Sequence, residues 1–230
     1  MSEPILRDAA VLPRGLYAIT PDGLPEATLL AKAEAALAGG AVVLQLRDKS
    51  GDAARRLRLA QALAALCRRF AARFIVNDDL PLALAVGADG LHLGVDDGDL
   101  LAARRALPPG AILGASCYAD IDLARRAVAV GADYVAFGAV FPSSTKPLAV
   151  RAPLSLLGRA RAELGVPVCA IGGITLANAA EIVAAGADLI AVVSDLFDPP
   201  GVDTGSVPSA ASAIGERAAA FQRLFKENRE

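Results

Sequence analysis

Short apolar runs alternate with longer helical patterns along the chain. Eight runs predict strands, near residues 15–20, 41–47, 73–77, 89–93, 111–116, 133–138, 167–171 and 188–193. Each run is nearly continuous in apolar residues, as is typical of strands buried on both faces of a parallel sheet. Helical patterns fill most gaps, such as Asp52–Phe70 and Ala119–Val130, and a shorter one covers Leu100–Leu107. Strands that alternate with helices in this way indicate βαβ units.

One phrase recurs at four of these strands, as AGGAVVLQLR, AVGADGLHLG, AVGADYVAFG and AAGADLIAVV. Each copy runs from an alanine-rich helical end through Gly-Ala into a strand, and glycine readily adopts the left-handed conformation that ends a helix. Eight βα units in 230 residues predict a single (β/α)8 TIM barrel of the α/β class. An open doubly wound sheet is the alternative. It would more naturally carry GxGxxG after its first strand, where this chain has TPDGLP.

We expect one domain over residues 1–230, with residues 1–13 as an N-terminal extension. Residues 199–208 are rich in Pro, Gly, Ser and Asp and predict a loop. The last helix, which closes the barrel, is then expected at about Ser209–Phe225.

Composition narrows the class of protein. The chain is 54% hydrophobic but only 4% aromatic, and its net charge of -2 gives no electrostatic case for nucleic acid. No apolar stretch approaches the roughly 20 residues of a membrane span, and early charges argue against a signal peptide. Cys67, Cys117 and Cys169 lie far apart without zinc-site spacing, as expected in a reducing cytosol. We therefore predict a cytoplasmic protein with no nucleic-acid or membrane partner; monomer and homo-oligomer both stay open.

Polar residues gather after the predicted strands, where barrel enzymes place their active sites. Arg47, Lys49 and Lys146 suit an anion such as phosphate or pyrophosphate. Asp78 and Asp97 follow adjacent strands and are expected to share a cation. Magnesium is usually held by one or two carboxylates together with substrate phosphates, so a magnesium pyrophosphate ligand explains both sets of charges.

A second anion site is predicted after strands seven and eight. There the chain has IGGI, with Gly172 and Gly173, and then Val193 and Ser194. Loops at these positions often bind phosphate through backbone N–H groups. Two phosphorylated substrates indicate displacement of pyrophosphate by a second phosphorylated molecule. The chain has one histidine, no GxSxG and no GxxxxGK[ST], which argues against a triad hydrolase and a P-loop kinase.

Each of these features also has a structural explanation. NDDLP can start a helix with Asn77 or Asp78 as N-cap, and VDDGD can form a turn. His92 alternates within an apolar strand, which favours a packed histidine over a catalyst or ligand. One helical stretch carries arginines that predict a solvated face, namely Arg55, Arg56, Arg58, Arg68 and Arg69. The functional interpretation is favoured because many modest signals coincide at one end of the barrel.

The sequence resembles thiamine-phosphate synthase from GLYAITPD to IAVVSDLF. The matching motifs occur in order as LYAIT, QLRDK, FIVNDD, ADGLHLGVDD, LGAS, GADYVAFGAVFPSSTK, AIGGIT and AVVS. The resemblance implies a (β/α)8 barrel that joins hydroxymethylpyrimidine pyrophosphate to a thiazole phosphate. The products are thiamine phosphate and pyrophosphate.

The resemblance also implies roles for individual residues. Gln45 would contact the pyrimidine, and Asp78 and Asp97 would bind magnesium. The pyrophosphate would be held by Arg47, Lys49, Asn77 and Lys146, with Ser116 near it. The thiazole phosphate would be surrounded by Ser143, Thr145, Gly173, Val193 and Ser194. The catalytic set is then expected to be Arg47, Lys49, Ser116 and Lys146.

The chain departs from the family pattern at three positions. The family usually has Gln at Val95, often His at Tyr118, and commonly Thr at Ser143. The related thiazole tautomerase is the closest alternative, but it lacks the metal-binding aspartate pair and is thought to use a histidine in the region of Tyr118. A non-catalytic phosphate-binding barrel is the alternative from another class. It would be expected to have lost Arg47, Lys49, Asp78 or Lys146.

Overall fold

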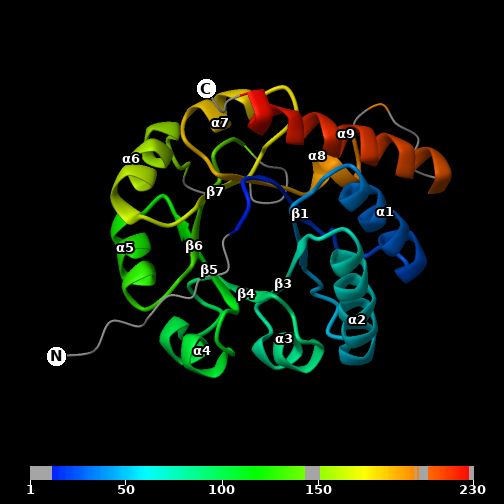
Figure 1. Cartoon of the computed structure of the whole chain (residues 1–230), viewed down its shortest axis with the longest axis horizontal. Helices are drawn as coiled ribbons and strands as arrows, with labels where there is room; N and C mark the ends of the chain where they lie inside the picture. Colours follow the sequence, from blue (N-terminus) through cyan, green and yellow to red (C-terminus); the bar gives the residue numbers. More distant parts are fainter. Residues whose placement is uncertain (1–11, 143–150, 200, 202–206, 228–230) are drawn as a thin grey trace.

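The computed structural model describes residues 12–142, 151–199, 201 and 207–227. Eight parallel strands form a closed barrel in sequence order, with the last strand paired to the first (Figure 1). The strands are β1 Gly15–Ile19, β2 Val43–Leu46, β3 Arg73–Asn77, β4 Gly90–Leu93, β5 Ile112–Tyr118, β6 Tyr134–Phe137, β7 Val168–Ile171 and β8 Leu189–Val192. The predicted TIM barrel is confirmed, and closure excludes the open sheet.

Helices surround the barrel on the outside (Figure 1). They are α1 Glu26–Ala38, α2 Ala53–Arg69, α3 Leu80–Val86, α4 Leu100–Ala106, α5 Ile121–Ala129, α6 Leu154–Leu164, α7 Ala179–Ala184, α8 Ser194–Phe197 and α9 Val207–Glu227. The last helix begins two residues earlier than predicted, inside the expected loop, and packs against α1 and α7. The four-residue α8 was not predicted, because one turn is too short to show a helical period.

Alternate residues of each strand face two different cores. Leu16 and Ala18 of β1 pack outward against the helices, whereas Tyr17 and Ile19 point into the barrel. This alternation is the period of two of any strand. The interior core is small and contains two tyrosines, Tyr17 and Tyr134, both fully buried.

The repeated glycine has the predicted backbone conformation in all four copies. Its φ is +100° at Gly40, +59° at Gly87, +101° at Gly131 and +107° at Gly186. Positive φ is easily adopted only by glycine, so each of these residues lets the chain turn from a helix into the next strand.

The aspartate in three of these repeats has a role that the sequence did not reveal. Asp89, Asp133 and Asp188 accept backbone N–H bonds from Phe74, Leu113 and Val168 at 2.8, 2.8 and 3.1 Å, respectively. Each bond ties the start of one strand to the start of its neighbour. These aspartates therefore brace the amino-terminal end of the barrel, opposite the end where active sites lie.

Among the described residues, no helix is both long and apolar enough to cross a membrane. The three cysteines are buried, and burial raises the pKa of the Cys67 and Cys117 thiols to about 12. Both thiols therefore stay protonated near neutral pH and make poor nucleophiles.

Candidate active site at the carboxyl end of the barrel

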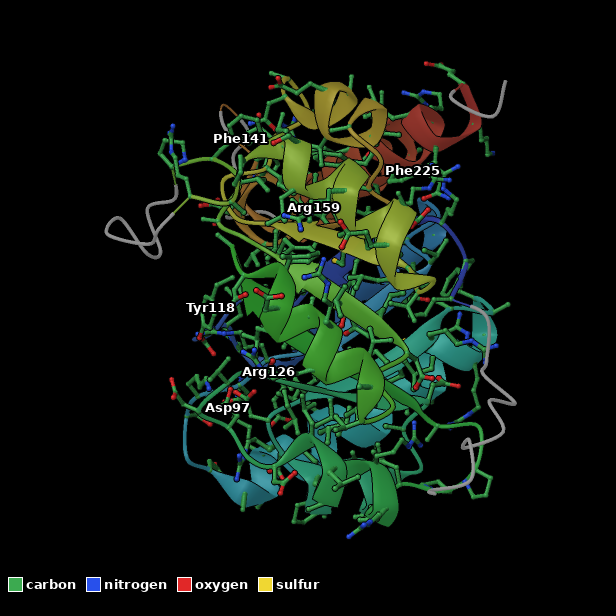
Figure 2. The ribbon with its side chains drawn as sticks, turned by 90° about the vertical axis from the view of Figure 1, so that its left-hand side faces the viewer. Asp97, Tyr118, Arg126, Phe141, Arg159 and Phe225 are labelled. Atoms are coloured by element: carbon green, nitrogen blue, oxygen red, sulfur yellow. The ribbon has the colours of Figure 1, made fainter. Side chains whose placement is uncertain are left out.

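The carboxyl ends of the strands form one side of the molecule. Figure 2 shows Asp97, Tyr118 and Phe141 toward the left, where they follow β4, end β5 and follow β6. Tyr118 is 44% exposed, and Val95, beside the acidic turn, is 49% exposed. Two of the departures from the family pattern are thus large side chains that solvent reaches at this end.

Asp78 is the centre of a charged cluster. Its Oδ2 accepts hydrogen bonds from Lys49 Nζ at 2.6 Å and from Asn77 Nδ2, and its carboxyl also lies within hydrogen-bonding reach of Asp97. Three strand ends, those of β2, β3 and β4, therefore bring together four of the residues that the sequence singled out.

The pKa of Asp78 is raised above its ordinary value. Burial is the largest cause, and the neighbouring Asp97 adds to it, while the hydrogen bond from Lys49 opposes both. Two carboxylates held side by side repel each other, and a cation would relieve that repulsion. The cluster is therefore electrostatically suited to bind one.

The backbone explains why Asp78 is available to the site. Asp78 has φ +62°, a left-handed conformation that costs a non-glycine residue about 1 kcal/mol. Its own N–H donates to the carbonyl of His92 at 2.9 Å, which fixes it to β4. The next residue, Asp79, is the N-cap of α3 and accepts from Leu82 N at 2.9 Å. The expected cap at Asn77 or Asp78 is therefore wrong, because the turn leaves the capping position one residue later.

The second acidic segment forms the predicted turn after β4. Asp97 Oδ2 accepts from Gly94 N at 3.0 Å, which closes the turn and orients the carboxylate. Asp99 caps α4 by accepting from Leu101 N at 2.7 Å. Asp96 is exposed between them. The aspartates of the two acidic segments thus have different roles. Asp79 and Asp99 cap helices, whereas Asp78 and Asp97 lie together at the strand ends.

Asp22 is a functional candidate to which sequence reasoning gave no role. It follows β1, forms an ion pair with Arg47, and accepts from Lys49 N at 3.0 Å. Thr20 supports the same segment, because its hydroxyl donates to Arg47 O at 3.1 Å. The loop after β1 therefore holds the guanidinium of Arg47 and the backbone at Lys49. The signal for Asp22 in the sequence was its place directly after the first predicted strand, in TPDGLP.

A hollow of about 330 Å³ lies beside this cluster. It is lined by Asp48, Lys49, Gly51, Arg56, Asn77, Asp78, Asp79 and Pro81. Arg56, predicted to lie on a solvated helix face, instead reaches this hollow and pairs with Asp79 Oδ2 at 3.1 Å. Its guanidinium adds a positive group close to the expected pyrophosphate position.

Gln45 and Ser116 lie deeper, at the top of the barrel interior. Gln45 is buried and donates from Nε2 to the hydroxyl of Tyr17 at 2.7 Å. Ser116 Oγ is 2.9 Å from Nε2 of His92, whose Nδ1 is 2.8 Å from the Tyr134 hydroxyl. The prediction that His92 is a packed histidine is confirmed, since it is buried with both ring nitrogens bonded.

The glycines after β7 are explained by contacts within the chain. Gly173 has φ +67°, and a Cβ there would stand 2.4 Å from Pro142 O. Gly172 has φ +97°, and its Cβ would be 2.6 Å from that of Ala139. The loops after β6 and β7 thus touch because both residues are glycine. Val193 and Ser194 lie at the start of α8, and the predicted residues Ser143, Thr145 and Lys146 lie outside the described residues.

The donor set fits magnesium. Within the described ranges no group of three or more His, Cys, Asp or Glu side chains is placed to hold a metal. Asp78 and Asp97 would therefore supply two oxygen ligands, and water and a bound phosphate would complete the shell. Magnesium is commonly bound in this way, by one or two carboxylates plus substrate oxygens.

Comparison with known proteins places this arrangement in a family. The sequence model described as "Thiamine monophosphate synthase" matches residues 16–196, which include the described residues of every cluster above. The chain belongs to the thiamine monophosphate synthase family. The thiamine-phosphate synthase of Aromatoleum aromaticum is 59% identical over 212 residues, 92% of this chain and 96% of that protein. That of Chromobacterium violaceum is 64% identical over 184 residues, which cover 80% and 88%.

A solved family structure agrees with the fold. Thiamine phosphate pyrophosphorylase from Pyrococcus furiosus superposes with a TM-score of 0.78 at 32% identity, covering 94% of this chain and 97% of that one. The two structures therefore share nearly the whole barrel.

Proposed function

We propose that this protein joins an aminopyrimidine carrying a methylene pyrophosphate, hydroxymethylpyrimidine pyrophosphate, to a thiazole phosphate. The products are thiamine phosphate and pyrophosphate. Family membership supports the activity, and the Asp78–Asp97 pair facing Lys49 is the observation that carries it here. A barrel that merely bound one phosphate would need cations but would have no use for two adjacent carboxylates.

The proposed reaction exchanges one bond for another at the methylene carbon. The C–O bond to pyrophosphate breaks and the leaving group takes the electron pair. The thiazole nitrogen then forms a C–N bond to the same carbon. The electron-rich pyrimidine stabilises positive charge on that carbon, so the protein has chiefly to stabilise the departing anion and hold the nitrogen nearby.

In this proposal the chain's own cations bind the leaving group. Arg47 offers a planar guanidinium that can bind two phosphate oxygens, and its ion pair with Asp22 orients it. Lys49 Nζ and Asn77 Nδ2, both bonded to Asp78, would turn to the ligand. Magnesium, held by Asp78 and Asp97, would add positive charge on the same anion. We further assign Lys146 to this anion by motif position.

The second substrate is proposed to lie across the loops after β6, β7 and β8. By motif position, Ser143, Thr145, Gly173, Val193 and Ser194 would bind its phosphate. The contact between the loops after β6 and β7 supports this, because it brings two of the three segments together. We place the reaction in the cytosol, in keeping with three buried thiols.

The decisive experiment is a coupled assay with the purified protein. We expect release of pyrophosphate and formation of thiamine phosphate only when both substrates and magnesium are present. Either substrate alone should give no more pyrophosphate than the blank, and EDTA should stop the reaction reversibly. A well-folded protein that releases no pyrophosphate under these conditions would overturn the proposal.

A further inference from the structure

A chain of hydrogen bonds crosses the interior of the barrel. It runs from Gln45 to Tyr17 at 2.7 Å, to Tyr134 at 2.8 Å, to His92 at 2.8 Å and to Ser116 at 2.9 Å. Its members come from β2, β1, β6, β4 and β5, so it joins strands on opposite sides of the barrel. Gln45, at one end, is the residue expected to contact the pyrimidine, and Ser116, at the other end, is expected to lie near the pyrophosphate.

The side chains of this hydrogen-bond network are packed in the core with little freedom. Tyr17 and Tyr134 are fully buried, with ring centroids 6.0 Å apart, and the His92 ring lies 5.5 Å from that of Tyr134. Gly114 makes room for this arrangement, since a Cβ there would stand 2.1 Å from Cζ of Tyr134. Rings packed this closely cannot turn to other partners.

The protonation states are fixed at neutral pH. Burial raises the pKa of both tyrosines well above the ordinary value. A charged His92 would donate from both ring nitrogens, and one of the two buried tyrosine protons would then have no acceptor among these five residues, so the geometry requires a neutral ring. Each phenol therefore has one proton to donate, and the imidazole has one N–H and one bare nitrogen.

With Gln45 Nε2 as the donor to Tyr17, these counts determine the direction of the remaining bonds. Tyr17 accepts from Gln45 Nε2, so its own proton goes to Tyr134. Tyr134 in turn donates to Nδ1 of His92. The imidazole proton must then be on Nε2, which donates to Ser116 Oγ. The Ser116 hydroxyl accepts from His92, so its own proton can be donated to another group. Gln45 uses its amide nitrogen for Tyr17, so its amide oxygen points away from Tyr17.

We propose that Tyr17, Tyr134 and His92 are positioning residues that fix the polarity of the site. They couple the two ends, so that Ser116 presents a donor whenever Gln45 presents an acceptor. This inference rests on the proposed function, which supplies the matching ligand. The amino group of the pyrimidine is a donor, and pyrophosphate oxygens only accept. Turning the Gln45 amide over would reverse every bond and leave Ser116 facing pyrophosphate with a lone pair.

The single histidine of the chain makes the polarity directly measurable. Nitrogen-15 NMR of the imidazole distinguishes its two neutral tautomers without any turnover. We expect the Nε2–H tautomer in the wild type at pH 7. Tyr134→Phe removes the donor to Nδ1 and should move the ring shifts toward a mixture of tautomers. Tyr118→Phe deletes a hydroxyl that is not part of the hydrogen-bond network and should leave the ring shifts unchanged. An Nδ1–H tautomer in the wild type, or unchanged shifts in Tyr134→Phe, would overturn the inference.

Kinetics then test whether the hydrogen-bond network affects the reaction through Ser116. We expect Tyr134→Phe to lower kcat by about 10-fold, with little change in KM for the thiazole phosphate, because it loosens one transition-state hydrogen bond. The same substitution in a Ser116→Ala background should have almost no further effect, since residues that act as a unit are not additive. Additive effects would mean that Tyr134 is only structural.

The two proposals can fail separately. A wild type that makes no thiamine phosphate overturns the proposed function, whatever the tautomer of His92. A wild type that turns over normally with the Nδ1–H tautomer, or with additive Tyr134 and Ser116 effects, overturns only the polarity inference. Tyr17→Phe gives an independent variant at the Gln45 end, should Tyr134→Phe not fold.

Discussion

Nζ of Lys49 lies 2.6 Å from Oδ2 of Asp78, so a cation expected to bind pyrophosphate holds a carboxylate expected to bind magnesium. The pair is only partly exposed at Asp78, whose side chain is 20% accessible, while Lys49 is 53% accessible. An arriving magnesium pyrophosphate would give each group a new partner of opposite charge. The ion pair thus keeps both groups oriented for their ligands.

Removal of either Asp78 or Asp97, the two carboxylates expected to bind magnesium, should nearly abolish turnover. We expect Asp78→Asn and Asp97→Asn each to lower kcat/KM by about 100-fold or more, because magnesium loses one of two protein ligands. The unfolding temperature should stay near that of the wild type. Asp96→Asn, in the same turn and exposed, is the matched control and should keep its activity. Full activity of both pair variants with magnesium would refute the metal assignment.

Asp22 should matter for catalysis although it touches no expected ligand. Asp22→Asn weakens the ion pair to Arg47 and the bond from Lys49 N, so the Arg47 guanidinium and the backbone that carries Lys49 gain freedom. We expect kcat/KM for the pyrimidine pyrophosphate to fall roughly 10-fold or more. Steady-state kinetics measure this directly. Glu26→Gln removes a partly exposed partner of Arg58 and should be neutral. Equal losses in the two variants would count against a specific role of Asp22.

The aspartates at the amino-terminal end should control stability and not activity. Asp133 accepts from Leu113 N at 2.8 Å and pairs with Arg104 at 3.0 Å, and both charged side chains are only 13–14% exposed. Asp133→Ala removes the carboxylate partner of Arg104, which keeps its bond to Ala111 O, and leaves the N–H of Leu113 without its acceptor. We therefore expect a loss of about 3 kcal/mol in urea unfolding. Asp122→Ala removes an exposed pair to Arg125 and should cost almost nothing. A loss of kcat without a loss of stability in Asp133→Ala would contradict this division.

His92 should make the folding stability of the protein depend on pH in mildly acidic solution. Its pKa is about 4 in the folded protein, against 6.5 ordinarily, because burial penalises the charged ring. Between these values the unfolded chain binds the proton and the folded one does not. The His92 contribution to stability is therefore complete above pH 6.5 and falls as the pH drops toward 4, by up to about 3 kcal/mol.

Unfolding curves of the wild type and His92→Gln over this pH range check that slope. The variant will be less stable overall, since it loses imidazole hydrogen bonds, so only the difference in pH dependence is informative. We expect the gap between the two proteins to narrow as the pH falls from 6.5 to 4. A constant gap would mean that the histidine titrates normally in the folded state.

The sequence by itself determined the barrel and the end at which its polar residues collect. Repeated Gly-Ala before four of the strands, with the glycine found at positive φ, is a local pattern that marks a helix end and a strand start. Continuous apolar runs then require burial on both faces, and eight such units have few other solutions in 230 residues. The residues after those strands follow from chain order alone, which is why Lys49, Asp78 and Asp97 could be placed together beforehand.

Only the tertiary structure decided which neighbouring residue does what. Asp79, and not Asp78, caps α3 because Asp78 takes a left-handed conformation bonded to β4. Tyr17 and Tyr134 are 117 residues apart, and their hydroxyls meet only because the barrel closes and the register of its strands points both rings inward. Such partners are set by strand register and closure. Those are properties of the whole sheet, and no local pattern of apolar and polar residues encodes them.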